Sequence, residues 1–307
     1  MSLVSYLQVI CDANGARHFS QRNSRVRGTF CLVRLRRALP LLAVLCGMCC
    51  AESIRPAEAQ GLIWTLPADG SWVRYEGTYA YIERKEESAV DSIEPWTKHL
   101  LIQSVGQEMR EYRGKMVACR WIEIEVTTGR KTEDGLDPGP LGIRRYRVLV
   151  PEPAVVGKLF DDDEIPVSML PIVEGYRKFG DRPVQTIKSN VLQVYPVLSL
   201  LQHYQQWNGA AAEPTDPGVK LGQVQATQRG ASLRIESRRF RSTSNAQLWR
   251  SQDVPFGLAK WKVTVLREEK DIVQPRSEFQ PVNEIIEEME VHAIGNNAKA
   301  LPDFLVK

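Results

Sequence analysis

One stretch decides the fold class, and it reads WVRYEGTYAYIER over residues 72–84. Every second residue from Val73 to Tyr81 is aromatic, aliphatic or glycine, and the residues between them include Arg74 and Glu76. Successive side chains of a strand point to opposite faces of a sheet. This period of two therefore predicts a half-buried antiparallel strand with one aromatic face.

Similar alternation extends along the chain in both directions. The longest run covers residues 116–128, where Ile122 and Ile124 alternate with Trp121 and Glu123. The short spacings between neighbouring candidates predict a meander of antiparallel strands rather than strand–helix–strand crossovers. Further strands are predicted over residues 99–105, 107–112, 143–150, 222–228, 232–240, 245–251, 258–268 and 284–294. We expect the last to be an edge strand, although Ile285-Ile286 also permits a short helix.

One helix is predicted over residues 196–207. Pro196 suits the first turn, apolar residues follow at three- and four-residue spacing up to Trp207, and Asn208-Gly209 supplies a stop. Such a helix has one apolar stripe, so we expect it to cover the open face of the sheet. Residues 151–183, which are rich in proline, are interpreted as an ordered excursion, and residues 210–218 and 271–281 as linkers.

The N-terminal region predicts export. Arg34, Arg36 and Arg37 precede an uncharged run of 14 residues, 38–51, and Ala57-Glu58-Ala59 follows as a small-x-small cleavage site. The run is shorter than the roughly 20 residues of a membrane-spanning helix. We therefore interpret residues 1–59 as a signal peptide with an N-terminal extension from a misassigned start codon. Residues 60–307 would form a single exported β-rich domain, periplasmic or extracellular after cleavage near Ala59, without an integral membrane span.

Charge and cysteine content both change when the predicted leader is set aside. The full chain carries a formal charge of +3, whereas residues 60–307 hold 32 basic and 34 acidic residues, a net charge of about −2. Such a charge argues against nucleic acid as a partner. Cys119 is the one cysteine in residues 60–307, so an internal disulfide is excluded there and stability must come from the core.

Motifs for catalysis or cofactor binding are missing from residues 60–307. Neither a glycine-rich phosphate loop nor an H-E-x-x-H pattern occurs, and His99, His203 and His292 lie far apart in the sequence. We therefore predict no catalytic residues, no metal and no cofactor. An alternative stays open, in which a hydrolase or metal-dependent enzyme is centred on His99, His203 or the carboxylates of residues 161–164.

Large apolar side chains are the best candidates for binding. All seven tryptophans lie in residues 60–307, and together with the predicted helix they could line an apolar cavity. Core packing is the simpler explanation of the same residues. Candidates for the lining, chosen by size and strand face, are Tyr79, Trp121, Leu200, Tyr204 and Trp261.

Two segments resemble the exported half-barrel proteins related to the lipoprotein carrier of the bacterial periplasm. One is Trp72-Val73-Arg74-Tyr75-Glu76, which opens the first long strand, and the other is DVPFGLAKW, residues 253–261. The resemblance would cover most of residues 62–294. It implies a strongly curved antiparallel sheet that wraps helices and leaves an apolar concavity. The long excursion of residues 151–183 departs from that pattern, and no ligand-contacting residue is carried over.

These observations predict a mainly β (α+β) protein, with a curved antiparallel sheet or half-barrel and one or two covering helices. The expected function is that of a non-catalytic exported cell-envelope protein. It would bind an apolar or lipid-like ligand, or an envelope protein partner, in the concavity of the sheet. Besides the enzyme alternative, a structural envelope protein stays open, in which an exposed strand edge pairs with a partner.

Overall fold

The computed structural model describes residues 61–84, 95–133, 135–139, 142–155, 170–192, 198–201, 204 and 213–304. These residues belong to the second of two compact units of the chain, Ile54–Lys307. The predicted leader, residues 1–59, lies outside the described residues, and so do His203 and the carboxylates of residues 161–164.

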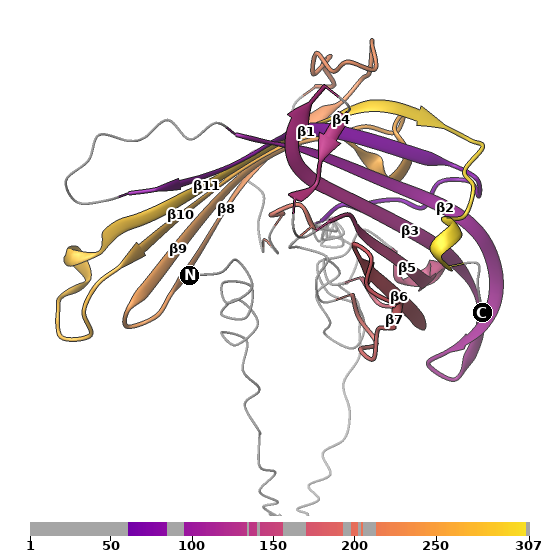
Figure 1. The fold of residues 1–307 in the computed structure, drawn as a ribbon, viewed down its shortest axis with the longest axis horizontal. Coiled ribbons are helices and arrows are strands. Elements are labelled where there is room, and N and C mark those ends of the chain that lie inside the picture. The colour runs from indigo at the N-terminus through magenta and orange to yellow at the C-terminus, as the bar shows by residue number, and fades with distance from the viewer. Residues whose placement is uncertain are drawn as a thin grey trace, which may run out of the picture. The chain divides into compact units, whose positions relative to one another are not determined.

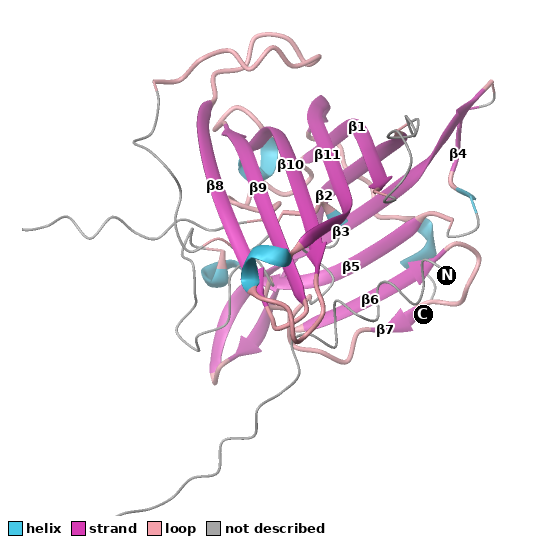
Figure 2. Cartoon of the chain, turned by 90° about the vertical axis from the view of Figure 1, so that its left-hand side faces the viewer, coloured by secondary structure: helices cyan, strands magenta, loops and turns pink. Residues whose placement is uncertain are grey.

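Strands make up most of the described part of the chain, and turns, irregular segments and short 3₁₀ segments join them (Figures 1 and 2). The strands are β1 (Trp72–Glu83), β2 (Trp96–Tyr112), β3 (Lys115–Thr132), β4 (Gly135–Asp137), β5 (Arg144–Pro151), β6 (Glu174–Phe179), β7 (Gln185–Thr186), β8 (Thr227–Glu236), β9 (Phe240–Arg250), β10 (Leu258–Glu269) and β11 (Gln280–Gly295). The 3₁₀ segments are η2 (Glu152–Ala154), η5 (Pro255–Gly257), η6 (Arg276–Glu278) and η7 (Pro302–Phe304).

All the described strands join one antiparallel sheet in the order β7-β6-β5-β3-β2-β1-β11-β10-β9-β8, with β4 paired to β3. Figure 1 shows that this sheet bends, with β8 to β11 on one side and β2 to β7 on the other. Register shifts, which increase local twist, occur at Arg74/Tyr75 in β1, Ser104/Gln107 in β2 and Arg267/Glu268 in β10. The sheet does not close into a barrel. Its antiparallel strands confirm the prediction of a mainly β protein with an antiparallel sheet.

The position of β11 corrects the prediction of a terminal edge strand. Its residues pair with β1 on one side, as in Gly77↔Met289, and with β10 on the other, as in Trp261↔Met289. The last strand in the sequence therefore lies near the centre of the sheet, between the first strand, β1, and β10. Alternation alone predicts a strand but not its neighbours, because a solvated edge strand and a central strand with one charged face have the same pattern.

The described residues also do not form the continuous helix that was predicted over residues 196–207. Of residues 196–207, the structure describes 198–201 and 204, and none of these five is α-helical. Leu200 has φ +48°, which a right-handed helix does not allow. Leu198, Leu201 and Tyr204 are nevertheless buried in the core. The spacing of apolar residues predicted correctly that the segment packs against the sheet, but not its conformation.

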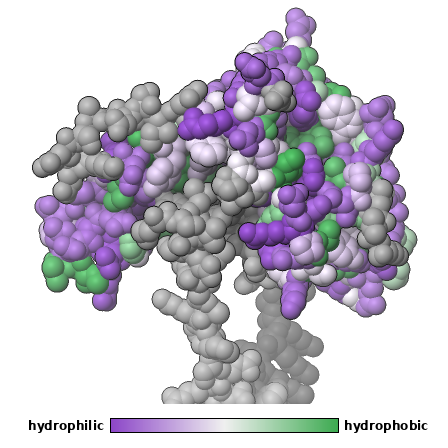
Figure 3. Space-filling view, viewed as in Figure 1, coloured by the Kyte–Doolittle hydropathy of each residue, from purple (hydrophilic) through white to green (hydrophobic). Residues whose placement is uncertain are grey.

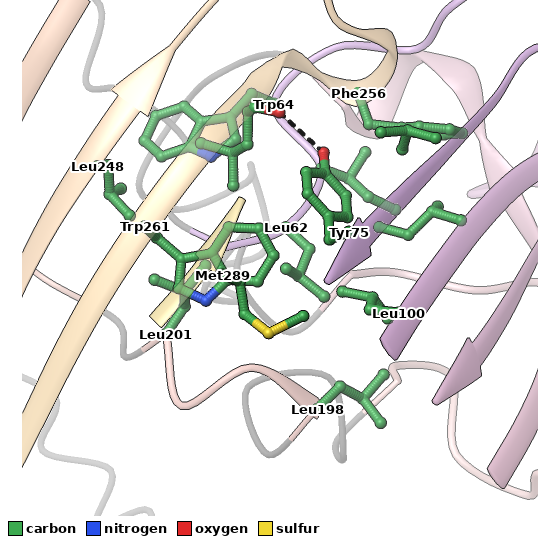
Figure 4. Packing of buried hydrophobic residues seen from close by; sticks show 14 of the residues in the cluster. Leu62, Trp64, Tyr75, Leu100, Leu198, Leu201, Leu248, Phe256, Trp261 and Met289 are labelled. Atoms are coloured by element: carbon green, nitrogen blue, oxygen red, sulfur yellow. Dashed lines mark hydrogen bonds between the residues drawn. The ribbon is translucent and has the colours of Figure 1, made fainter. Parts of the chain in front are cut away.

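One side of the sheet is called here the apolar face. It carries the buried side chains of Tyr75, Leu100, Ile124, Tyr146 and Trp261. Among the described residues, segments outside the strands cover this face. Their buried residues in the core are Leu62, Trp64, Leu170, Ile172, Leu192, Leu198, Leu201, Val219, Val224 and Phe256. Figure 4 shows Leu198 and Leu201 on such segments, with Leu201 near Trp261 and Met289 of the sheet.

The opposite side, called here the charged face, is partly covered by the C-terminal segment, residues 296–304. Glu123 of β3 lies under this segment with no exposed surface, and its carboxylate accepts hydrogen bonds from the backbone N–H of Leu301, from Gln103 and from Arg147 at 2.8–2.9 Å. Burial raises the pKa of Glu123, against the opposing effect of these three donors. The segment is thus held by a satisfied polar network.

Asp303 makes attachment of this segment dependent on pH. Its carboxylate bonds to Lys178 and, at 2.7 Å, to Arg145, and the hydrogen bond from Lys178 holds the pKa of Asp303 below its ordinary value of 3.8. A carboxyl group with a lowered folded-state pKa stabilises the fold fully above its unfolded pKa. That contribution disappears as the pH falls through the folded pKa.

We therefore expect the Asp303→Asn variant to be less stable than the wild type at about pH 5, and the difference to shrink towards zero near pH 2. Urea unfolding of both proteins across this range measures it. The matched control is Asp181→Asn at an exposed turn, for which we expect a difference from the wild type of less than about 0.5 kcal/mol at pH 5. A constant deficit of Asp303→Asn at every pH would contradict the assignment.

Candidate functional site

Two oppositely charged side chains lie within the apolar face. Lys98 of β2 and Glu287 of β11 form a hydrogen-bonded ion pair across β1, and their side chains are 4% and 0% exposed. In the register, Lys98 lies opposite Gly77 and Glu287 opposite Tyr79. The ammonium group also lies 5.8 Å from the centre of the Tyr79 ring. Removing two charges from water is costly, so a charged pair at this position is unusual on a mainly apolar face.

Trp261 of β10 completes the cluster. Its indole N–H donates to Glu287 Oε1 at 2.8 Å, and the Tyr75 ring packs edge-on against it with centroids 4.9 Å apart. The Tyr75 hydroxyl donates to the carbonyl of Leu258 at 2.9 Å, which is the contact drawn dashed in Figure 4. Four adjacent strands, β2, β1, β11 and β10, therefore contribute to one polar cluster, called here the Lys98 cluster: Lys98, Glu287, Tyr79, Trp261 and Tyr75.

The electrostatics of the cluster follow from its burial. Desolvation lowers the pKa of Lys98, against the opposing effect of Glu287, whose negative charge favours the protonated amine. Desolvation also raises the pKa of the Tyr75 hydroxyl far above its ordinary value. An ammonium group carries three donors, and among the described residues the Lys98 ammonium makes one hydrogen bond, to Glu287. The cluster thus retains donor capacity that the described side chains do not use.

The five predicted lining residues do not all lie on one side. Trp261 and Tyr204 are buried on the apolar face, and Tyr79 and Leu200 are partly buried against the same core. The Tyr204 hydroxyl lies 3.1 Å from Ser244 Oγ of β9, which ties the covering segment to the sheet. Trp121 lies on the charged face, next to Tyr176 and under the Arg147 guanidinium. Whether the other four line a ligand cavity stays a prediction.

Lys98 and Glu287 were not among the residues that sequence reasoning singled out. The sequence did contain a signal for Glu287. In the alternating pattern of β11 it falls on the same face as Ile285, Met289 and Val291, which form the apolar side of the strand. A charged residue at an apolar position of a strand marks a buried, paired charge. Lys98 carried no comparable signal, because it precedes the predicted strand of residues 99–105.

The residues of the enzyme alternative are only partly described. His99 and His292 both flank Glu76 on the charged face; His292 Nδ1 lies 3.4 Å from Glu76 Oε2, and the pKa of His99 is lowered by partial burial. No group of three or more histidine, cysteine or carboxylate side chains in the described residues could hold a metal ion. Cys119 is buried, and burial raises the pKa of its thiol, which disfavours a nucleophilic thiolate.

Within the part of the chain that the structure describes, no helix has the length and apolarity needed to cross a membrane. No protein-family model and no curated protein sequence matches this chain.

Proposed function

We propose that this protein is a non-catalytic binding protein of the cell envelope, which acts after export. It holds an apolar, lipid-like ligand on the apolar face of its sheet. The ligand's polar head group, a carboxylate or phosphate, accepts hydrogen bonds from Lys98. The observation that carries the proposal is the buried Lys98 ammonium, which has donors that no described side chain other than Glu287 uses, in a mainly apolar environment.

Two features support a ligand in preference to a purely structural core. Ligand sites are typically apolar surfaces with a few precisely placed polar groups, and groups with shifted pKa values cluster in them. The Lys98 cluster has both properties. A replacement of the ion pair by apolar side chains would often stabilise a protein, so a buried pair is poorly explained by stability alone.

The cover of the apolar face supports exchange of the ligand. Residues 198–201 lie outside the strand pairing of the sheet, and such segments open at lower free-energy cost than central strands. Ser199 Oγ on this segment is buried and has no hydrogen-bond partner among the described residues. A movement of the segment would open a path from the surface to the sheet without breaking any strand pairing.

Native mass spectrometry and solvent extraction of the detergent-free protein test the proposal. We expect a co-purifying lipid-like molecule, and at least about a tenfold lower occupancy in the Lys98→Met/Glu287→Gln variant, because loss of a hydrogen-bonded charge contact costs on the order of 1.5–3 kcal/mol. Glutamine keeps an acceptor for Trp261. The matched control is Lys262→Met, an exposed lysine paired to Glu288 on the charged face, which should retain the ligand. Wild-type protein without such a molecule, or equal occupancy in the double variant, would contradict the proposal.

A further inference from the structure

Two strand connections at one end of the sheet expose apolar side chains. The connection between β8 and β9 carries Ile235 and Phe240 at its base, and the connection between β10 and β11 carries Ile272 and Val273. Their exposed fractions are 61%, 50%, 59% and 93%. Figure 1 shows the two connections side by side at the ends of β8 to β11, on the side of the sheet away from β5 to β7. Figure 3 shows hydrophobic atoms at this end of the molecule.

The turn that presents Ile272 and Val273 is firmly held. The backbone N–H of Gln274 donates to the carbonyl of Asp271 at 3.1 Å, so Ile272 and Val273 are the two central residues of this turn. Lys270 Nζ donates to the carbonyls of Asp271 and Gln274, at 3.0 and 2.8 Å. Central turn positions favour glycine, proline, asparagine and aspartate. Two consecutive large aliphatic residues there are placed outward by the turn itself and contribute nothing to the core.

The two connections form one unit. The backbone N–H of Lys270 donates to the carbonyl of Arg239 at 3.0 Å, and Arg276 and Glu236 form an ion pair at 2.6 Å. A groove between the connections is lined by Glu236, Ser237, Arg238, Lys270, Ile272 and Arg276. We call this unit, residues 234–241 and 267–278, the hairpin end. Its apolar side chains are therefore presented together.

The charge of the hairpin end is opposite to that of the rest of the domain. It contains seven basic and five acidic residues, a net charge of +2, whereas residues 60–307 as a whole have about −2. Two of its acids, Glu236 and Glu268, are paired with Arg241, and Glu236 also with Arg276. Arg234, Arg238 and Arg239 are exposed next to the apolar side chains, and the Arg239 guanidinium lies 5.5 Å from the centre of the Phe240 ring.

We infer that the hairpin end docks on a bilayer surface that contains anionic phospholipids. Exposed aliphatic and aromatic residues flanked by arginine and lysine match such a surface. The apolar side chains enter the boundary between head groups and acyl chains, and the basic side chains contact the phosphates. Protruding turns suit a soft surface better than a protein groove of fixed shape. The inference goes beyond the proposed ligand site and does not depend on it.

Sedimentation of the full chain with sucrose-loaded vesicles tests the inference. We expect binding to phosphatidylcholine vesicles with about one-third phosphatidylglycerol, weakened by high salt, and much weaker binding to phosphatidylcholine alone. Arg238→Gln/Arg239→Gln should lower binding to the anionic vesicles by about 25-fold, since each basic residue contributes roughly fivefold. Ile272→Ser/Val273→Ser should lower it by at least about tenfold, because the apolar area that enters the lipid is lost.

The matched control is Met109→Ser/Met116→Ser, which removes two residues of similar exposure, 57% and 63%, from the β2–β3 hairpin. We expect this variant to bind as the wild type does. Equal binding to both vesicle types would overturn the inference. Unchanged binding of the Ile272→Ser/Val273→Ser variant would do the same, because another part of the chain would then be responsible. Self-association in sedimentation equilibrium without lipid, abolished by the same substitutions, would assign the hairpin end to a second copy and also overturn it.

Discussion

Replacement of Lys98 by methionine is expected to lower the free energy of unfolding by about 3–5 kcal/mol. The substitution leaves the Glu287 carboxylate fully buried with the Trp261 indole as its remaining described partner. An uncompensated buried charge is among the most destabilising changes that a single substitution can make. Urea unfolding, followed by the fluorescence of the tryptophans, measures the loss.

The double variant Lys98→Met/Glu287→Gln separates charge burial from packing. It removes both charges and keeps a hydrogen-bond acceptor for Trp261, so we expect it to be within about 2 kcal/mol of the wild type and more stable than Lys98→Met. Lys262→Met, at a half-exposed ion pair with Glu288, should change stability by less than about 1 kcal/mol. If Lys98→Met were as stable as the double variant, the pair would not be desolvated as the structure describes.

The second large effect is expected at Gly77, where the backbone of β1 lies close to that of β11. A Cβ atom at this position would lie 1.9 Å from the carbonyl oxygen of Glu288 and 2.8 Å from Met289 Cα, both backbone atoms. The strands would have to separate to admit it, next to the Lys98 cluster. We expect Gly77→Ala to cost about 3 kcal/mol or more of unfolding free energy.

Gly230→Ala in β8 is the matched control for Gly77→Ala. A Cβ atom there meets nothing closer than the carbonyl oxygen of Ala246 at 3.7 Å, an ordinary contact. Because glycine weakens a strand by its conformational entropy, we expect this variant to be as stable as the wild type or more stable by up to about 1 kcal/mol. Thermal and urea unfolding of both variants give the comparison, and equal effects at the two positions would show that β1 and β11 are not in such close contact.

Most strands could be predicted from alternation because each strand exposes one face and buries the other. The predicted residues 72–84 and 258–268 agree with β1 and β10 almost residue for residue. The two predicted strands of residues 99–105 and 107–112 are one strand, β2, with a register shift between Ser104 and Gln107. Residues 222–226 precede β8 instead of forming a strand, because β8 begins at Thr227.

The candidate site was harder to predict because it depends on which strands are neighbours. Trp121 was chosen for its size, yet its parity places it with Glu123 on the charged face. Lys98 and Glu287 are 189 residues apart in sequence and meet because β11 inserts beside β1. The prediction placed the segment of β11 at an edge and assigned it no neighbouring strand, so it could not indicate this pair.

Neighbouring residues in the sequence determine where the strands lie and which face of the sheet each side chain points to. The reason is that backbone pleating imposes a period of two on every strand. The prediction of a continuous helix over residues 196–207 was wrong for a related reason. The spacing of apolar residues indicates which side chains are buried, whereas the backbone conformation of this segment follows from its packing against the sheet. The central place of β11, the burial of the Lys98 ion pair and the joining of two turns into the hairpin end arise from pairing between distant segments. Such pairing is selected by the free energy of the whole sheet, and no single stretch of sequence specifies which distant segment its residues will meet.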